Sequence, residues 1–288
     1  MGKTIFELLT KEELNKIPIG EISFVAFDLE TTGLFPPTNR VVEIGGVKFK
    51  RDRIEAYFNQ LINPRCSIPK DAYYIHHISD EMVADMPRIE DVLPSFLSFI
   101  KDSVLIAHVA TFDADFISCE LARSNIVPPS NIILDTRNLT RFLFPYIPNY
   151  KLETISQYFD FEADGLHRAL TDSTICFKIF RECIKRLKGR WNTPFYELVK
   201  INGQLYKFNS YQFQRGEDGF LFIERVTKAI EKNEKIKIIY ANGFGEISER
   251  LISPHAIIYY KENIYLNAFC YLRNEERSFR ADRILKLF

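Results

Sequence analysis

The 288-residue sequence predicts an α/β domain followed by a smaller, β-rich domain. Up to about residue 187, short apolar segments alternate with amphipathic helical segments, which is the pattern of an α/β fold. After residue 220, one helical segment is followed only by short strand-like segments. The length agrees with two domains, because a single hydrophobic core rarely serves so long a chain.

Three strand-like segments and a helix open the expected α/β domain. Gly45 and Gly46 interrupt the second strand and predict a β-bulge there. Ser79 precedes two acidic residues and predicts a helix N-cap. The expected elements are a helix at 4–16, strands at 22–27, 41–49 and 56–62, a helix at 89–101, a strand at 104–107, a helix at 113–123, a strand at 132–134, and helices at 151–158 and 169–187.

Residues 188–219 lack periodicity and carry isolated aromatic residues and glycines, so we expect a linker that packs against part of the fold. The following domain opens with a helix at 223–232, and Asn242–Gly243 predicts a hairpin turn after its first strand. Its expected strands lie at 236–240, 247–252, 256–260, 264–269 and 277–279. We therefore expect a small β-barrel or strongly bent sheet behind one helix, in a chain divided into residues 1–187, 188–219 and 220–288.

The composition excludes several classes of protein. Hydrophobic residues (46%) and charged residues (26%) occur in the proportions of an ordinary globular protein. The five cysteines form no CxxC pair, which argues against a zinc ribbon and a secreted disulfide framework. No segment has the apolar character of a signal peptide or the ~20 apolar residues of a membrane span. We expect a cytoplasmic protein without a membrane partner.

The net charge is zero but unevenly distributed. Residues 181–288 hold 20 Lys and Arg against 13 Asp and Glu, and the preceding residues carry the balancing excess of acid. A basic C-terminal part suits a polyanionic partner, and an acidic N-terminal part suits a cluster of metal-binding carboxylates. The alternative is a chance asymmetry of solvated surfaces.

Asp28 and Glu30 are the first candidate metal ligands. They lie two residues apart on a predicted strand, so their side chains share one face. The preceding Phe24–Phe27 segment is apolar, which predicts a central strand whose acids are not on a free surface. Two carboxylates so close repel each other unless a cation lies between them. The alternative is a pair of solvated acids at a strand end.

Two further segments place acidic residues near a histidine. Asp113 lies at the start of a helix after a buried strand, where α/β proteins place ligands, and Asp115 competes with it in the same turn. His167 and Asp172 are five residues apart, and they converge if His167 lies in a loop and Asp172 in the first turns of a helix. Small Ala169 would let that helix approach the site. The alternative for each is a solvated residue near a helix start.

Together, three segments resemble the motifs of the DEDDh family of 3′-to-5′ exonucleases, which includes the proofreading subunit of bacterial replicative polymerase. They are Phe27–Gly33, His108–Asp113 and His167–Asp172. The resemblance covers roughly residues 22–185 and implies an RNase H-like α/β fold with a mixed central sheet. Position 168 is Arg and not the Tyr of the family's other branch, which indicates the His branch.

The resemblance also implies roles for individual residues. Four carboxylates would hold two divalent cations, Mg²⁺ or Mn²⁺, and His167 would act as the general base. The family usually has Asn after its first histidine, whereas this chain has Val109. Two roles for His108 therefore stay open, which are contact with the substrate and hydrogen bonding within the fold. The implied metal ligands are Asp28, Glu30, Asp113 and Asp172, and the terminal nucleotide is held by Thr31, Thr32, Gly33 and Leu34.

Residues 220–288 resemble a WYL domain. The resemblance is carried by Arg250–Pro254, Tyr265–Cys270 and Arg277–Ile284, although Ile264 stands where the name-giving Trp would be. WYL domains are small Sm-like barrels that sense ligands, including nucleic acids or nucleotides. Four arginines interleaved with aromatic residues are candidates for binding phosphates: Arg273, Arg277, Arg280 and Arg283. The alternative is a charged face in which nearby acids pair with them.

These features predict a metal-dependent 3′-to-5′ exonuclease that releases nucleoside 5′-monophosphates from single-stranded DNA or frayed 3′ ends. A role in DNA replication or repair follows, with a polymerase or repair protein as a candidate partner. Two alternatives stay open. In the first, the enzyme acts on RNA, because these motifs do not distinguish the sugars of DNA and RNA. In the second, the chain is a nucleic-acid or nucleotide sensor in which the exonuclease fold is mainly a binding platform.

Overall fold

The structure is a computed structural model that describes residues 16–36, 39–161, 167–209, 220–241, 246–260 and 263–288. The chain forms two compact units, Met1–Asn209 and Ser210–Phe288. The helix expected at 4–16 lies outside the described residues apart from Lys16, and so does the turn expected at Asn242–Gly243.

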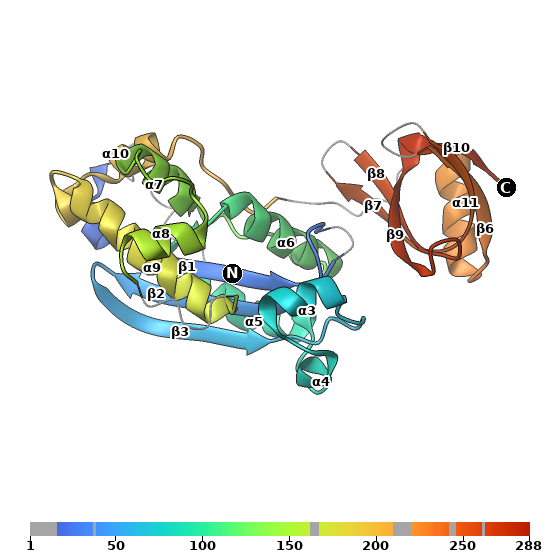
Figure 1. Cartoon of the computed structure of the whole chain (residues 1–288), viewed down its shortest axis with the longest axis horizontal. Helices are drawn as coiled ribbons and strands as arrows, with labels where there is room; N and C mark the ends of the chain where they lie inside the picture. Colours follow the sequence, from blue (N-terminus) through green and yellow to red (C-terminus); the bar gives the residue numbers. More distant parts are fainter. Residues whose placement is uncertain (1–15, 37–38, 162–166, 210–219, 242–245, 261–262) are drawn as a thin grey trace. The chain divides into compact units, whose positions relative to one another are not determined.

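The first unit is built on a five-stranded mixed sheet in the order β3-β2-β1-β4-β5 (Figure 1). β1 runs antiparallel to β2 and parallel to β4. Seven of the eight residues of β1 are buried, so this strand is central, as its apolar sequence predicts. The strands are β1 (Phe24–Thr31), β2 (Val41–Lys50), β3 (Arg53–Leu61), β4 (Val104–Ala107) and β5 (Ile133–Asp135).

Helices pack against both faces of this sheet, and the side chains of β1 alternate between the two layers (Figure 1). Phe24 and Ala26 share a hydrophobic core with α7, α8, α9 and α10, whereas Val25 and Phe27 share another with α5 and α6. The helices are α3 (Lys70–His76), α4 (Asp80–Val83), α5 (Ile89–Ile100), α6 (Ala110–Arg123), α7 (Thr136–Leu143), α8 (Leu152–Tyr158), α9 (Ala169–Arg186) and α10 (Phe195–Asn202), with 3-10 turns η1 (Ile19–Glu21) and η2 (Arg190–Asn192).

The two glycines of β2 allow close packing and do not form the expected bulge. A Cβ atom on Gly45 would lie 2.1 Å from the carbonyl carbon of Ala169 at the start of α9, and one on Gly46 would lie 2.9 Å from the Phe99 ring. The pairing of β1 with β2 is continuous through both glycines and shifts only near the end of β1. Gly45 therefore determines how closely α9 approaches the sheet.

The aromatic stretch after α9 packs on the first unit as far as Asn209. Phe195 and Leu198 of α10 join the core beneath α9, and Phe208 joins the core beneath α5 and α6. The backbone N–H of Asn209 donates to Ser118 Oγ at 2.9 Å. Residues 188–209 thus belong to the first unit by their contacts, and residues 210–219 lie outside the described residues.

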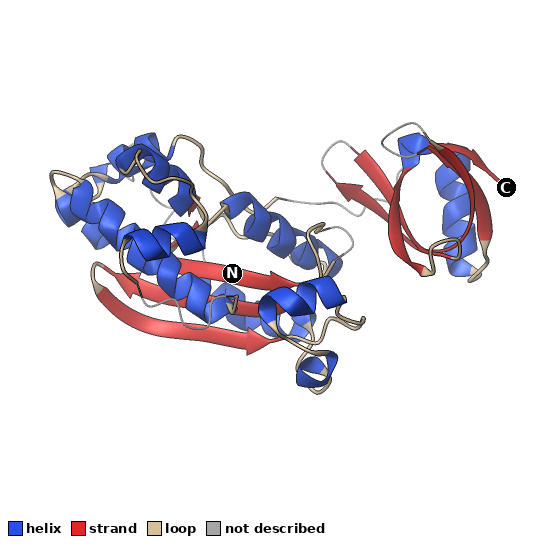
Figure 2. Ribbon diagram, in the orientation of Figure 1, coloured by secondary structure: helices blue, strands red, loops and turns tan. Residues whose placement is uncertain are grey.

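The second unit is one helix packed against a five-stranded antiparallel sheet in the order β10-β6-β7-β8-β9. Leu266 and Ala268 of β8 share its core with Val226 and Ala229 of α11. Figure 2 shows the strands curving around this helix. The elements are α11 (Phe220–Glu231), β6 (Ile236–Ala241), β7 (Ile247–Tyr260), β8 (Asn263–Cys270), β9 (Glu275–Arg280), the 3-10 turn η3 (Ala281–Arg283) and β10 (Ile284–Leu287).

The described strands of this unit form the expected bent antiparallel sheet, in which β9 and β10 have one described neighbour each. One expectation for this unit needs correction. The two strands expected at 247–252 and 256–260 form the single strand β7, because a register shift between Pro254 and Ala256 bends the strand without ending it. β6 and β7 pair antiparallel, with Ala241 opposite Ile247, and the turn expected between them lies outside the described residues.

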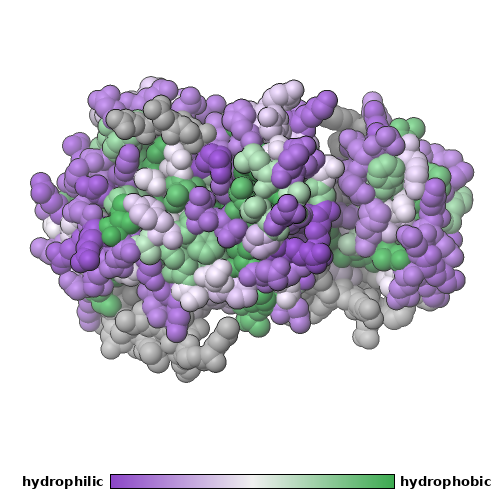
Figure 3. Space-filling view, turned by 90° about the horizontal axis from the view of Figure 1, so that it is seen from below, coloured by the Kyte–Doolittle hydropathy of each residue, from purple (hydrophilic) through white to green (hydrophobic). Residues whose placement is uncertain are grey.

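Hydrophilic side chains predominate on the face of the molecule shown in Figure 3, and hydrophobic ones lie between them in small groups. Within the described part of the chain, no helix combines the length and the apolar composition needed to cross a membrane.

Candidate active site

Asp28 and Glu30 lie on the face of β1 that α9 covers. Strand alternation places both on the same side as Phe24, which packs beneath that helix. Their cross-strand partners on β2 are Gly45 and Glu43, respectively. Glu30 is buried and Asp28 is partly buried, as expected for acids on a central strand.

Asp172 completes a group of three carboxylates. It is buried in the first turn of α9, whose start rests on Gly45. One carboxylate oxygen from each of Asp28, Glu30 and Asp172 lies within 4.8 Å of the other two. Asp172 Oδ1 is buried and has no hydrogen-bond partner among the described residues. Converging carboxylate oxygens of this kind fit a hard divalent cation.

Asp113 approaches from α6 and lies outside that group of three. It is buried in the first turn of the helix, after Val109 in a left-handed conformation with φ 65°. Burial raises the pKa of Asp113 well above its usual value, although backbone hydrogen bonds at Asp113 and Leu29 oppose the rise. After burial itself, the charge of Asp113 is the largest influence that raises the pKa of Asp28.

Burial and mutual repulsion both disfavour the charged forms of these acids. Burial raises the pKa of Glu30 to about 8 and the pKa of Asp172 to about 7. It also raises the pKa of Asp28 well above its usual value, and neighbouring carboxylates add to the effect. A divalent cation would stabilise the charged forms against both influences, so these residues fit a metal site.

His167 lies at the edge of this group, just before Arg168, the N-cap of α9. Its backbone is left-handed with φ 66°, and its side chain is exposed. Its backbone N–H donates to Asp172 Oδ2 at 3.3 Å. The two residues therefore converge as the sequence predicts, with His167 before the helix and Asp172 in its first turn.

His108 is held within the fold through both ring nitrogens. Nδ1 lies 2.9 Å from Thr136 Oγ1, and Nε2 lies 2.9 Å from the carbonyl oxygen of Tyr150. Burial lowers the pKa of His108. Of the two interpretations left open by the sequence, these contacts favour hydrogen bonding within the fold over substrate contact.

The segment after β1 is held by its own hydrogen bonds and presents one apolar side chain. Thr31 Oγ1 donates to the Gly33 carbonyl oxygen at 2.7 Å, and Thr32 Oγ1 accepts from the Arg40 backbone N–H at 3.0 Å. Both threonines are buried, whereas Leu34 is 82% exposed. Among these residues, Leu34 therefore presents an apolar side chain to solvent.

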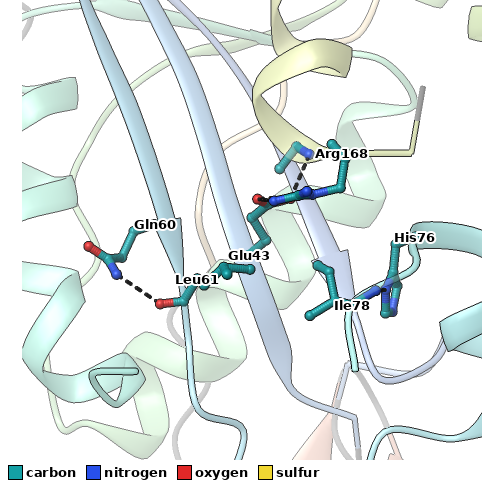
Figure 4. A network of polar contacts seen from close by, with 7 residues as sticks. Glu43, Gln60, Leu61, His76, Ile78 and Arg168 are labelled. Carbon is teal, nitrogen blue, oxygen red and sulfur yellow. Dashed lines mark hydrogen bonds and ion pairs between the residues drawn. The ribbon is translucent and has the colours of Figure 1, made fainter. Parts of the chain in front are cut away.

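The residues predicted from the sequence do not include an ion pair beside the site, between buried Glu43 and partly exposed Arg168 (Figure 4). Glu43, opposite Glu30, is 1% exposed. Its carboxylate accepts from Arg168 Nε at 3.0 Å, from Arg168 Nη2 at 2.6 Å and from the Ala169 backbone N–H at 2.9 Å. In the sequence, Glu43 is marked only as an acidic residue inside an apolar strand. Arg168 is used in the sequence analysis only to distinguish the His branch of the family from the Tyr branch.

His76, also in Figure 4, is a further buried polar residue near the site. Nδ1 accepts from the Ile78 backbone N–H at 3.0 Å, and Nε2 is buried without a partner among the described residues. Burial lowers the pKa of His76, and the nearby backbone of Thr31 opposes that effect. His76 therefore lies close to the end of β1.

The four candidate arginines of the second unit do not gather on one face. Arg277 and Arg280 are three residues apart on β9, so strand alternation points them to opposite sides. Arg277 forms an ion pair with Glu275. Arg273 is exposed before β9, and Arg283 is partly buried in η3.

Sequence reasoning missed one buried arginine in this unit. Arg250 is 9% exposed and donates to Ser248 Oγ at 3.0 Å and to Cys270 Sγ at 3.7 Å. Its guanidinium lies about 6 Å from the ring centres of Tyr240 and Phe279, at 6.0 and 5.9 Å. Within the described part of the chain, no ion pair joins Arg250 to a carboxylate.

Comparison with family models divides the chain in the same way as its contacts. An exonuclease family model matches residues 25–180, and a WYL domain model matches residues 222–288. Both resemblances expected from the sequence are thereby confirmed.

Similar proteins lie among replicative polymerases and nucleases. DNA polymerase III subunit epsilon of Treponema pallidum is 38% identical over 165 residues, which are 57% of this chain and 77% of that protein. The PolC-type DNA polymerase III of Caldanaerobacter subterraneus is 38% identical over 168 residues, or 58% of this chain, but the match spans only 12% of that polymerase. Exonuclease I of E. coli, solved with zinc and single-stranded DNA, aligns with a TM-score of 0.55 at 13% identity, covering 86% of this chain and 54% of that one. This likeness confirms the expected RNase H-like α/β fold with a mixed sheet.

Proposed function

Because the chain belongs to the exonuclease family, we propose that it is a 3′-to-5′ exonuclease that hydrolyses DNA from single-stranded or frayed 3′ ends and releases nucleoside 5′-monophosphates. The observation that carries the proposal is the convergence of Asp28, Glu30 and Asp172 within 4.8 Å. The similarity to a subunit of DNA polymerase III favours DNA over RNA.

The proposed cofactors are two divalent cations, Mg²⁺ or Mn²⁺, held by Asp28, Glu30, Asp172 and the nearby Asp113. When bound, such cations acidify a water molecule and stabilise the charge that develops on the phosphate oxygens. His167 would accept the proton of that water at a ring nitrogen, because its backbone N–H contacts Asp172 and its side chain is exposed. Every cation ligand supplied by the chain is an oxygen, which suits these hard ions.

The segment Thr31–Leu34 is the proposed site for the 3′-terminal nucleotide. Its internal hydrogen bonds fix the backbone beside Glu30, and the exposed Leu34 contacts the sugar or base. A fixed segment of this kind places the last phosphodiester at the carboxylates without ordering a loop at each turnover.

Oligonucleotides of DNA and RNA, labelled at either end, test this function in Mg²⁺ or Mn²⁺. A 3′ label should be released in the first turnover as a mononucleotide, whereas a 5′ label should appear on a ladder of shortening products. A chelator should stop both reactions reversibly. Cleavage from the 5′ end, or cleavage unaffected by chelator, would contradict the proposal, and faster loss of RNA would reassign the substrate.

A second function, ligand binding by the second unit, is favoured by the buried guanidinium of Arg250. Together with Arg273, Arg277, Arg280 and Arg283 it is a candidate for binding phosphates of nucleic acids or nucleotides. Closure of this unit into an Sm-like barrel and a cytoplasmic location remain part of the proposal, as does a polymerase or repair partner. Fluorescence anisotropy with labelled single strands tests the binding, and Arg250→Gln should weaken it.

A further inference from the structure

Besides Asp28, Glu30, Asp113 and Asp172, the site has a neighbouring fifth carboxylate, that of Glu43. Its oxygens already accept hydrogen bonds from other residues. Glu43 lies directly across the sheet from Glu30, and its side chain is almost wholly buried. Three N–H groups, two from Arg168 and one from the backbone of Ala169, donate to its two oxygens. The forked guanidinium matches a carboxylate in this two-point geometry. Glu43 therefore faces the start of α9 and is not available as a cation ligand.

The start of α9 and the residues just before it also include His167 and Asp172, two residues with proposed roles in the reaction. His167 precedes Arg168, and the Asp172 backbone N–H donates to the carbonyl oxygen of Arg168 at 3.0 Å. Ala169 rests on Gly45, two residues from Glu43 on β2. Two contacts therefore fix the start of the helix to β2. The backbone of Ala169 packs on Gly45, and Arg168 forms an ion pair with Glu43.

We propose that Glu43 and Arg168 are positioning residues that fasten the start of α9 to β2, so that Asp172 and His167 stand opposite Asp28 and Glu30. The inference rests on the proposed function, since it concerns the same cation site. Arg168 has a second effect, because it neutralises a buried charge beside Glu30. Without the pair, Asp172 no longer has a fixed place against the two acids of β1.

A double-mutant cycle tests this positioning. Glu43→Gln, Arg168→Gln and the double variant are compared with the parent by Mn²⁺ calorimetry and by kcat and KM on a DNA oligonucleotide. Each single variant should weaken Mn²⁺ binding and lower kcat by about 10–100-fold, the usual effect of losing a group that orients metal ligands. KM for the oligonucleotide should change little. The double variant should resemble either single variant, because both disrupt one interaction.

Two further variants keep the test independent of folding. Arg168→Lys retains the charge without the fork, so it should lose several-fold less than Arg168→Gln. Arg65→Gln removes an exposed ion pair with Glu90 elsewhere in the first unit and should behave as the parent. Thermal melting in chelator establishes that each compared variant is folded.

Three results would overturn the inference. In the first, Arg168→Gln binds Mn²⁺ and cleaves as the parent does. In the second, the losses multiply in the double variant. In the third, only Glu43→Gln weakens Mn²⁺ binding, which would make Glu43 a cation ligand. If the parent cleaves no oligonucleotide but the Mn²⁺ affinities still show the coupled loss, the proposed function fails and the positioning role stands.

Discussion

The two units of this chain place their charged side chains in opposite ways. In the first unit, Asp28, Glu30 and Asp172 converge, and each of their side chains is buried or partly buried. Mutual repulsion and desolvation therefore both disfavour their charged forms. In the second unit, ion pairs such as Arg277–Glu275 are exposed to solvent. Exposed pairs contribute little to stability, whereas buried like charges cost stability and persist where function requires them. The contrast supports the proposed chemistry in the first unit and the proposed binding role of the second.

Removal of one carboxylate should give the largest effect on activity. Asp28→Asn should lower cleavage by about 10²–10³-fold or more, since it removes a central charge of the cation site. The same change should raise the melting temperature in chelator, because it removes a repelling buried acid. Cleavage assays and thermal melting measure the two effects. A variant as active as the parent would show that the contrast between the units has no catalytic meaning.

Loss of the proposed base comes next. His167→Ala should lower kcat by about 10²–10⁴-fold, the usual effect of losing a general base. Oligonucleotide affinity should change far less, because His167 is exposed at the edge of the carboxylates. Single-turnover rates and anisotropy titrations separate the two quantities. Parallel loss of affinity and rate would make His167 a substrate-binding residue.

Gly45→Ala sharpens the comparison by acting on packing and not on charge. Its new Cβ atom would meet the backbone of Ala169 at 2.1 Å, which must push α9 away from β2. We expect a loss of about 1–3 kcal/mol in the free energy of unfolding and reduced Mn²⁺ affinity. Gly46→Ala is the matched control, because the nearest atom to its new Cβ atom belongs to the Phe99 side chain, at 2.9 Å, and not to the backbone of α9. Equal effects of the two changes would show that the approach of α9 does not depend on Gly45.

The smallest expected effect lies in the second unit. Joint substitution of Arg277 and Arg280 by Ala should weaken binding of long single strands, with a salt dependence shallower by about 0.7 for each lost phosphate contact. Cleavage of a short oligonucleotide should not change, since the carboxylates are elsewhere. Binding titrations across a salt series measure this. Unchanged affinity at every salt concentration would identify these arginines as ordinary surface residues.

The sequence predicts part of the carboxylate group from spacing alone, because Asp28 and Glu30 share a strand face by simple alternation. Asp172 lies on a distant helix, and its place beside these two acids is expected from the resemblance to the exonuclease motifs. Strand alternation shows equally directly that Arg277 and Arg280 diverge, once β9 is known to span both. The alternating strands and helices predict the α/β fold, and the apolar Phe24–Phe27 segment predicts a central β1. The mixed sheet is expected only from the resemblance to the exonuclease family.

Other features depend on contacts between distant residues and cannot be predicted from spacing. The Glu43–Arg168 pair joins positions 125 residues apart, and neither residue has a distinctive local pattern. From the sequence, Gly45 is interpreted as a bulge residue, and only the folded structure shows that it allows the close approach of α9. The hydrogen bonds of His108 to Thr136 and Tyr150 likewise require the folded chain.

The thermal stability of the protein as a function of pH, with and without Mg²⁺, tests the central claim most directly. The folded pKa values of Glu30 and Asp172, about 8 and about 7, exceed the ordinary values of 4.5 and 3.8. Folding therefore favours their protonated forms, so the stability they contribute in chelator is present at low pH and is lost as pH rises towards 8.

We predict that the melting temperature in chelator falls between pH 5 and pH 8, and that, within this range, saturating Mg²⁺ raises it most at pH 8, where protons compete least with the cation. Asp28→Asn combined with Asp172→Asn should abolish this Mg²⁺ effect. A melting temperature that Mg²⁺ leaves unchanged at pH 8, or raises equally in the double variant, would contradict a cation site at these carboxylates.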